Sequence, residues 1–392
     1  MGKAPTGRPA DPQYQGRSTV TGRSILTQAF LRHFGSVPRQ RFQSPLQLNL
    51  MGEICDLCQG LVLCCAEERQ LGVALDRRSD SRVDILVCDS QGRPLPHLSP
   101  SQFHPAQQAT DVLIAALRQR GYRLGGLRLL VLLPDGVPFT QQPDAVKIAL
   151  AYALNQQLEL GLSTKGLAKL AAQQPGHDDS GSRPGEQFAA LISSTGHCAL
   201  VDYGRLSWQR IPLPDELSLF RVDLGFSTDE FSALKRRKRQ QTKQLIHYFS
   251  VGALRELSME RLNRARGLLS EDLFGCARHL LSEHQRALSL ADALVEKRLD
   301  EIGPLLASAH LSLKREFGFE SRHANLLVSH VNRLVGNRGG ARLLSSGEVI
   351  ALIPKERKTA IVEQVTQQYT QRFGVYATFF NINAASGAHS VR

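Results

Sequence analysis

The chain has 392 residues, a net charge of +12 and a hydrophobic content of 42%. That length exceeds one ordinary hydrophobic core and predicts two domains of roughly 150–200 residues each. No stretch reaches the roughly 18 apolar residues that cross a bilayer, and residues 1–24 lack an apolar signal segment, so we expect no membrane contact. Seven cysteines, an odd number, favour reduced thiols in the cytoplasm over a disulfide framework.

The N-terminal half is predicted to alternate helices and strands after a flexible tail at residues 1–24. Helical apolar spacing covers residues 25–34, residues 105–119 and a segment opened by Pro143. Short β-branched or alternating runs predict separate strands at residues 61–63, 72–75, 83–87 and 127–133. Residues 174–185 are rich in Gly, Pro and Ser, which predicts a surface loop.

The C-terminal half begins with strands and then becomes helical. Strands are expected at residues 199–202, 206–213 and 220–224, and helical spacing dominates residues 228–317. Strand, strand, helix and strand then follow at residues 341–344, 349–353, 359–373 and 376–382. The composite is an α+β protein with a boundary near residues 205–225, which we place between lobes at 25–210 and 211–392.

One segment carries the most specific pattern. Residues 44–56 read SPLQLNLMGEICD and resemble the galactokinase signature, which usually reads APGRVNLIGEHTD. Further segments that resemble the same family follow in the family's order, at residues 196–202, 211–214, 278–283 and 308–313. The resemblance implies a two-lobed GHMP-kinase-like fold, with an N-terminal mixed α/β lobe and a helix-rich C-terminal lobe ending in a ferredoxin-like β-α-β unit.

For the sugar, the resemblance assigns binding to Glu53 and Asp56, because carboxylates accept several hydrogen bonds from hydroxyls. In this family galactose meets ATP and Mg²⁺ in the interlobe cleft, and its anomeric hydroxyl receives the γ-phosphoryl group. Phe231 is the third candidate sugar-binding residue and stands where a Tyr is usual, while Ile54 stands where a His is usual, so two polar contacts are lost. Without the family, Glu53 and Asp56 read as a pair that caps a helix N-terminus.

The catalytic positions depart from the family pattern. Gln47 replaces an Arg with a neutral amide, and such a charge contributes about 3 kcal/mol to stabilising a transition state. Glu186 stands at the position of a catalytic Asp, and its extra methylene moves the carboxylate by about 1 Å. The alternative for Glu186 is an exposed glutamate in a loop.

Both loops that should hold phosphate also depart from the pattern. Residues 134–144 read PDGVPFTQQPD in place of a Gly/Ser-rich run, and proline donates no N–H to a phosphate. Residues 344–348 replace a glycine-rich third motif. The candidate cofactor-binding residues are Gly136, Thr140, Ser345, Ser346 and Gly347. ATP and Mg²⁺ are expected if the chain is active and no cofactor if it is not, and no metal ligands are predicted.

These departures predict a pseudokinase with weak or absent phosphoryl transfer, which binds galactose or another sugar or sugar phosphate. The alternative is an active galactokinase with altered loops. A second alternative is a nucleic-acid-binding protein that uses a basic helix at residues 235–243, where residues 235–239 read KRRKR. No aromatic-interleaved basic module accompanies this run, so a solvated helix face is favoured.

A metal or redox site is one interpretation of four clustered cysteines, Cys55, Cys58, Cys64 and Cys65. A structural zinc site needs a second well-spaced pair, and adjacent cysteines do not readily face one ion. We therefore expect these cysteines to be small buried residues of the core.

Overall fold

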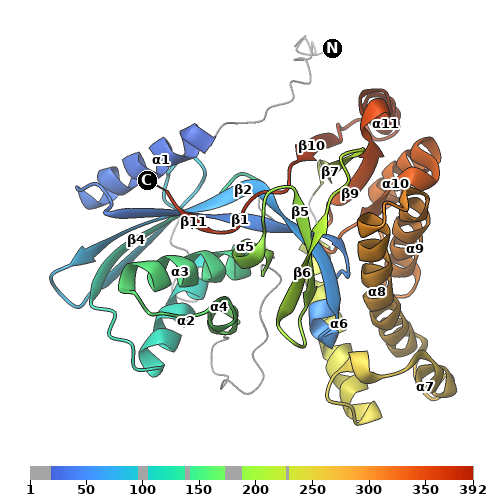
Figure 1. Ribbon diagram of the computed structural model, residues 1–392, viewed down its shortest axis with the longest axis horizontal. Coiled ribbons are helices and arrows are strands. Elements are labelled where there is room, and N and C mark those ends of the chain that lie inside the picture. The colour runs from blue at the N-terminus through green and yellow to red at the C-terminus, as the bar shows by residue number, and fades with distance from the viewer. Residues whose placement is uncertain (1–18, 96–104, 137–141, 173–187, 227–228, 392) are drawn as a thin grey trace, which may run out of the picture.

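The computed structural model describes residues 19–95, 105–136, 142–172, 188–226 and 229–391. Its strands form two sheets, one of seven strands and one of four, with helices packed around both (Figure 1). The α+β class is therefore confirmed.

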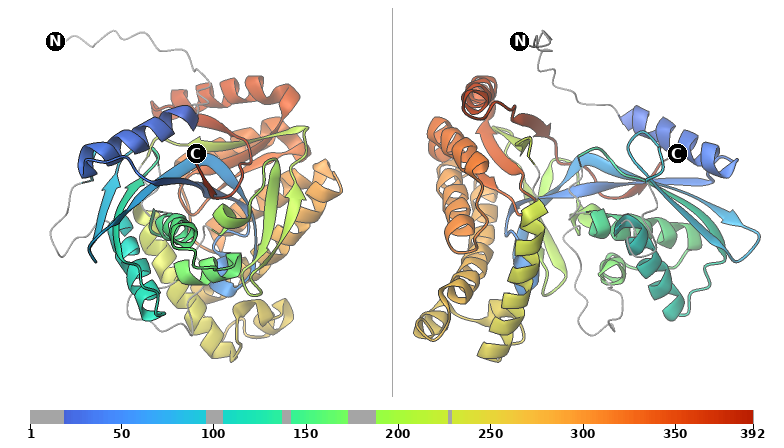
Figure 2. Two further views of the ribbon diagram at one scale, coloured as in Figure 1. Left: turned by 60° about the vertical axis from the view of Figure 1, so that its left-hand side comes forward. Right: turned by 180° about the vertical axis from the view of Figure 1, so that it is seen from behind.

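The larger sheet is built around β1 (Gln40–Met51) and β2 (Leu61–Arg78), which pair antiparallel. The other strands are β3 (Val83–Cys88), β4 (Gly126–Leu132), β5 (His197–Asp202), β6 (Ser207–Pro212) and β11 (His389–Ser390). The helices α1 (Thr19–Phe34), α2 (Pro105–Gln119), α3 (Gln142–Leu158), α4 (Thr164–Ala171) and α5 (Ala189–Ile192) accompany it. Figure 2 shows α1 on one face of this sheet and α2 to α4 on the other.

The smaller sheet has the order β10-β7-β9-β8, and all its neighbours are antiparallel. Its strands are β7 (Leu217–Asp223), β8 (Gly340–Leu343), β9 (Val349–Pro354) and β10 (Thr378–Ile382). The helices of this part are α6 (Asp229–Phe249), α7 (Met259–Arg264), α8 (Glu271–Val295), α9 (Ile302–Arg315), α10 (Arg322–Val335) and α11 (Lys358–Phe373). Short 3-10 turns lie at η1 (Cys55–Cys58), η2 (Leu254–Glu256), η3 (Leu299–Glu301), η4 (Gly336–Arg338) and η5 (Lys355–Arg357).

The structure corrects three expectations about the elements. Residues 61–63 and 72–75 belong to one strand, β2, because residues 66–70 stay extended and the charge of Glu67 is paired inside the protein. Helix α1 begins at Thr19, so residues 19–24 are not part of a tail. Helix α10 was not predicted, although it buries Leu327, Val328, Val331 and Val335 at helical spacing.

One apolar core joins the two sheets. Val62 and Val201 of the larger sheet lie in the same buried cluster as Phe220 of β7 and Leu280 of α8. Strand β6 spans the expected boundary near residue 210, and β11 returns to pair with β1, so the division into lobes stays a prediction. Among the described helices, none combines the length and apolarity needed to cross a bilayer.

Candidate functional site

The predicted sugar-binding residues lie in the tight connection between β1 and β2. Gly52 has a φ of 86°, and a Cβ on it would lie 2.3 Å from the Leu61 carbonyl oxygen, so this position requires glycine. Ile54 also has a positive φ of 63° and occupies the cap position of η1, without a side-chain cap bond. Asp56 follows in η1 and is buried. The connection is therefore held in one unusual conformation.

The carboxylate of Glu53 points to the loop between β8 and β9. Its Oε1 accepts hydrogen bonds from the Ser345 N–H, at 3.2 Å, and from the Ser345 hydroxyl. The structure thus brings together a predicted sugar-binding residue and a predicted nucleotide-loop residue that are 292 positions apart. Glu53 does not occupy a helix cap position, because Ile54 does.

The backbone of the same connection is bound by Glu283 of α8, a residue to which the sequence assigned no role. Glu283 is fully buried, and its Oε1 accepts the N–H groups of Gly52, at 3.2 Å, and Glu53, at 3.3 Å. Burial alone would raise the pKa of Glu283, but Arg342 and Arg286 hold this pKa well below its ordinary value. The sequence signals for Glu283 were its place in the family-like segment at residues 278–283 and its position as a single glutamate on the apolar face of a long helix.

Gln47, predicted to replace a catalytic arginine, is buried in β1, and its amide bonds neutral groups of Asn49 and Ala189. Its Nε2 donates to the Asn49 Oδ1 at 2.7 Å, and its Oε1 accepts from the Ala189 N–H at 2.8 Å. These partners fix the amide between β1 and α5. The position therefore supplies no positive charge.

Arg69 of β2 connects the two predicted phosphate loops. Its Nη1 donates to the Gly136 carbonyl at 2.5 Å, and its Nη2 lies 2.6 Å from Glu67 and 3.6 Å from Glu348. Arg221 of β7 completes the group, at 2.7 Å from Glu348 and 3.4 Å from Glu67. We call Glu67, Arg69, Arg221 and Glu348 the four-charge cluster. It contains two positive and two negative side chains.

The cluster is largely shielded from water. The side chain of Glu67 is fully buried, that of Arg221 is 6% exposed, and those of Glu348 and Arg69 are 11% and 15% exposed. The Arg221 guanidinium also lies 4.2 Å from the centre of the Phe380 ring. Because each arginine already faces carboxylates at short range, the cluster offers little net attraction to an anion.

The hairpin loop after β8 owes its shape to a glycine and a serine. Gly347 has a φ of 88°, and its N–H donates to the Leu344 carbonyl at 3.0 Å. The Ser346 hydroxyl donates to Glu348 at 3.1 Å. Ser345, Ser346 and Gly347 therefore lie together, beside Glu53 on one side and the four-charge cluster on the other.

Other predicted site residues do not join this group in the described structure. Phe231 is buried in the core, with its ring centre 5.2 Å from that of Phe319. Glu186 and Thr140 lie outside the described residues, so their roles stay predictions.

All seven cysteines are buried and free, as expected for Cys55, Cys58, Cys64 and Cys65. Burial raises the pKa of the Cys64 thiol well above its ordinary value, which suppresses the reactive thiolate. Within the described residues no group of three or more His, Cys, Asp or Glu side chains is arranged to hold a metal ion.

The basic run lies in α6 and is only partly solvated. Lys238 is 1% exposed, and its Nζ lies 2.7 Å from Asp272 and 5.1 Å from the centre of the Phe317 ring. Arg237 pairs with the same Asp272. The run therefore contributes one residue to the core and is not a uniformly exposed basic stripe.

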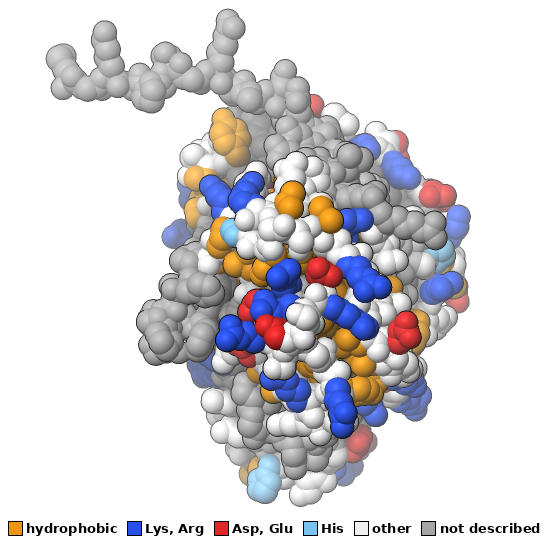
Figure 3. Space-filling model, turned by 90° about the vertical axis from the view of Figure 1, so that its left-hand side faces the viewer, with side chains coloured by type: hydrophobic (Ala, Val, Ile, Leu, Met, Phe, Trp, Pro, Cys, Tyr) orange, Lys and Arg blue, Asp and Glu red, His pale blue; other side chains and the backbone are white. Residues whose placement is uncertain are grey.

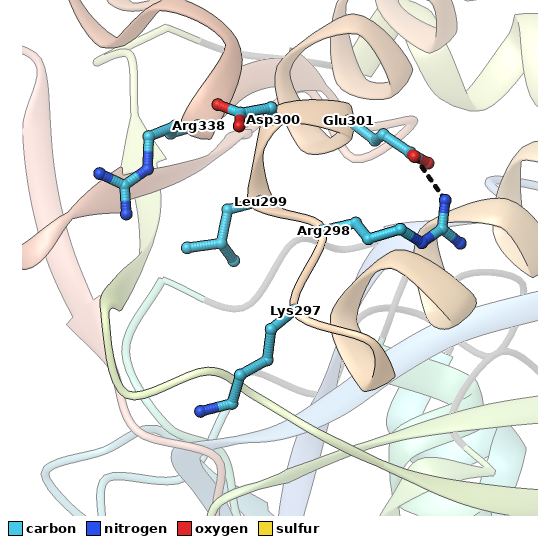
Figure 4. Close-up of a pocket in the computed structure, with 6 residues that line it drawn as sticks. All are labelled: Lys297, Arg298, Leu299, Asp300, Glu301 and Arg338. Atoms are coloured by element: carbon cyan, nitrogen blue, oxygen red, sulfur yellow. Dashed lines mark hydrogen bonds and ion pairs between the residues drawn. The ribbon is translucent and has the colours of Figure 1, made fainter.

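A surface pocket of about 570 Å³ lies apart from these residues, between the α8–α9 and α10–β8 turns (Figure 4). It is lined by Lys297, Arg298, Leu299, Asp300, Glu301 and Arg338. Figure 4 shows Arg298 turned to Glu301, with which it pairs, and Lys297 pairs with Glu216. No predicted site residue lines this pocket.

Comparison with known proteins shows one matching family signature and a shared fold. The galactokinase galactose-binding signature matches residues 28–77, which include the Glu53 connection and most of β2. The structure of Lactococcus lactis galactokinase complexed with galactose has a TM-score of 0.80 at 20% identity, over 94% of this chain and 100% of that one. Homoserine kinase from Cytophaga hutchinsonii reaches 0.55 at 15% identity, over 90% and 97% of the two chains. Mevalonate kinase from L. major reaches 0.54 at 14% identity, over 90% and 99%. The chain therefore has the fold shared by these kinases and carries the galactokinase galactose-binding signature over residues 28–77.

Proposed function

We propose that this protein binds galactose or a closely related sugar or sugar phosphate through Glu53 and Asp56, and that its phosphoryl transfer is weak or absent. Both carboxylates lie within the segment that matches the galactose-binding signature. Glu53 is fixed by hydrogen bonds both at its backbone N–H and at its carboxylate. A side chain fixed in this way suits sugar recognition, because it accepts hydrogen bonds from hydroxyls without first losing side-chain freedom.

The observation that carries the second half of the proposal is the four-charge cluster. Phosphoryl transfer relies on positive groups and N–H donors that neutralise the triphosphate. Here Arg69 and Arg221, which contact the loops predicted to hold phosphate, are each paired with Glu67 and Glu348. A nucleotide phosphate approaching these arginines would have to displace carboxylates and would meet their negative charge.

The residues around the loops fit Mg²⁺ and ATP poorly for the same reason. Gln47 is neutral, and both of its amide atoms are engaged by protein groups. Pro134 precedes Gly136 in the loop sequence and supplies no N–H donor.

An active galactokinase remains the second candidate, favoured by the similarity to galactokinase over 94% of the chain. In that case Glu186 would act as the base or polarising group, and ATP with Mg²⁺ would bind at the two loops. The two candidates differ in nucleotide affinity and turnover, while both require sugar binding.

Nucleic-acid binding is not part of the proposal. Lys238 is directed to the core, and Figure 3 shows basic side chains on one face of the protein interspersed with acidic and apolar ones. Seven free buried thiols fit a reducing compartment, and we propose the cytoplasm as the location.

Calorimetry with galactose tests the sugar site. We expect measurable binding by the unmodified protein and a loss of about 10-fold or more in Glu53→Gln and Asp56→Asn, because a hydrogen bond to a charged group contributes about 1.5–3 kcal/mol. Glu68→Gln is the matched control, since this neighbouring carboxylate is exposed and bonds only Asn383 among the contacts described. Equal affinities in all four proteins would refute the assignment of Glu53 and Asp56.

A further inference from the structure

We propose that Glu283 is a positioning residue, which fixes the backbone at Gly52 and Glu53 and so aims the Glu53 carboxylate at the sugar. This inference rests on the proposed sugar-binding function. It concerns a residue on α8, more than two hundred positions along the chain from the connection that it holds.

The Glu283 carboxylate is buried away from solvent. Helix α8 starts at a cap in which the Ser270 hydroxyl accepts from the Leu273 N–H, and it buries Cys276, Leu280 and Ala287 on the face that carries Glu283. An unpaired charge there would be strongly destabilising, so its presence demands close partners.

Both carboxylate oxygens of Glu283 are engaged. Oε1 accepts the Gly52 and Glu53 N–H groups and also faces Arg342, while Oε2 accepts from the Arg286 Nε at 2.8 Å. The two N–H groups directly precede Ile54, whose φ of 63° a β-branched residue adopts only when its surroundings hold it. Glu283 is thus the group that satisfies these buried donors.

Arg342 links this anchor to the hairpin that holds the other end of Glu53. It is fully buried, and its Nη1 contacts the Met51 sulfur at 3.0 Å as well as Glu283. Three residues further along the same chain segment, Ser345 binds the Glu53 carboxylate. Glu53 is therefore held at its N–H from α8 and at its head group from the loop after β8.

The hydrogen bonds at the N–H and at the carboxylate of Glu53 together determine the direction in which this carboxylate points. If Glu283 loses its charge, Arg342 loses the buried counterion with which it pairs, and the hydrogen bonds from the Gly52 and Glu53 amides weaken. Sites whose ligand-binding groups lose their supporting contacts become loose by fractions of an ångström, with a loss of affinity and of selectivity.

The test uses Glu283→Gln in the full-length protein, with galactose and the series of monodeoxygalactoses as probes. We expect about 10-fold weaker galactose binding and a reduced penalty for the deoxy sugar that the unmodified protein disfavours most. Amide hydrogen exchange at Gly52 and Glu53, measured without ligand, should be faster in this variant. A purely structural role would lower stability without changing discrimination among the sugars.

Asp272→Asn is the matched control, because Asp272 lies on the same helix and pairs with the buried Lys238, away from the Glu53 connection. We expect it to lower stability while leaving sugar discrimination and the two amides unchanged. Arg342→Lys keeps a positive charge but loses the guanidinium, and it should show the same changes as Glu283→Gln to a smaller extent. It replaces Glu283→Gln if that variant does not fold.

The outcomes separate the two proposals. If the unmodified protein binds no galactose, the proposed function fails, while slow exchange at Gly52 and Glu53 that depends on Glu283 would still support the anchor. If the folded variants keep normal amide exchange and normal discrimination among sugars, the positioning role of Glu283 is refuted.

Discussion

Glu67→Gln tests the four-charge cluster most sharply, because it removes one negative charge while nearly preserving shape. The unmodified cluster pairs the fully buried Glu67 with Arg69 at 2.6 Å and Arg221 at 3.4 Å. The variant leaves two guanidinium groups with Glu348 as their remaining carboxylate within the cluster. One unit of positive charge is then uncompensated in a poorly hydrated place.

The expected cost follows from this burial. Breaking a buried ion pair by neutralising one partner costs about 3–5 kcal/mol. Arg69 and Glu348 are 15% and 11% exposed, so water partly screens the excess charge, and we expect the low end, about 3 kcal/mol. Glu68→Gln, at an exposed neighbouring position, should change stability by no more than about 0.5 kcal/mol.

Urea unfolding followed by circular dichroism gives the free energy of unfolding for each protein. Added sulfate should recover about 1.4 kcal/mol in Glu67→Gln at ten times its dissociation constant, because an anion can replace the missing charge. It should have a smaller effect on the unmodified protein. If Glu67→Gln is within about 1 kcal/mol of the unmodified protein, or if sulfate stabilises both equally, the charge-balance argument is wrong.

Three further predictions concern other parts of the structure. Gly52→Ala should lower the free energy of unfolding by at least about 2 kcal/mol, because alanine at a φ of 86° is strained and its Cβ would meet the Leu61 carbonyl; a change below about 0.5 kcal/mol in urea unfolding would contradict the tight connection. Burial lowers the pKa of His279 to about 3, so the folded protein takes up fewer protons than the unfolded chain below the ordinary pKa of 6.5. Its contribution is therefore present above pH 6.5 and falls by about 2 kcal/mol between pH 7 and pH 5, a loss that His279→Asn should remove from the pH dependence of unfolding. Burial also raises the pKa of Cys276 to about 12 and that of Cys88 to about 11. A thiol reagent at pH 8 should therefore modify fewer than one of the seven cysteines in the folded protein and all seven in denaturant. Rapid labelling of several thiols in the folded protein would disprove their burial.

The sequence predicted the strongly apolar elements, such as α2, whose apolar residues recur at helical spacing, and β4 and α3, which are apolar along most of their length. It failed where a charge is buried. Residues 61–63 and 72–75 were predicted as separate strands, yet one strand continues through residues 66–70, because the buried Glu67 pairs with Arg221 from a distant part of the chain. The local sequence does not show which distant residues will pair with a buried charge.

The dependence on distant partners also explains which site residues the sequence predicted and which it missed. Family motifs pointed to Glu53 and Ser345 separately, and the structure shows that they bond each other. Glu283 lay within a motif that resembled the family, but its role depends on two backbone amides far along the chain. By contrast, α10 could have been predicted, since its buried residues follow an ordinary amphipathic pattern.

The central claim is that this galactokinase fold recognises a sugar without efficient phosphoryl transfer. Steady-state release of ADP from MgATP in the presence of saturating galactose tests it most directly, with an active galactokinase as the positive control. Small-molecule and protein kinases typically turn over at about 1–100 s⁻¹, and we predict a rate at least about a thousandfold below that range. Galactose-dependent turnover within the range would contradict the account.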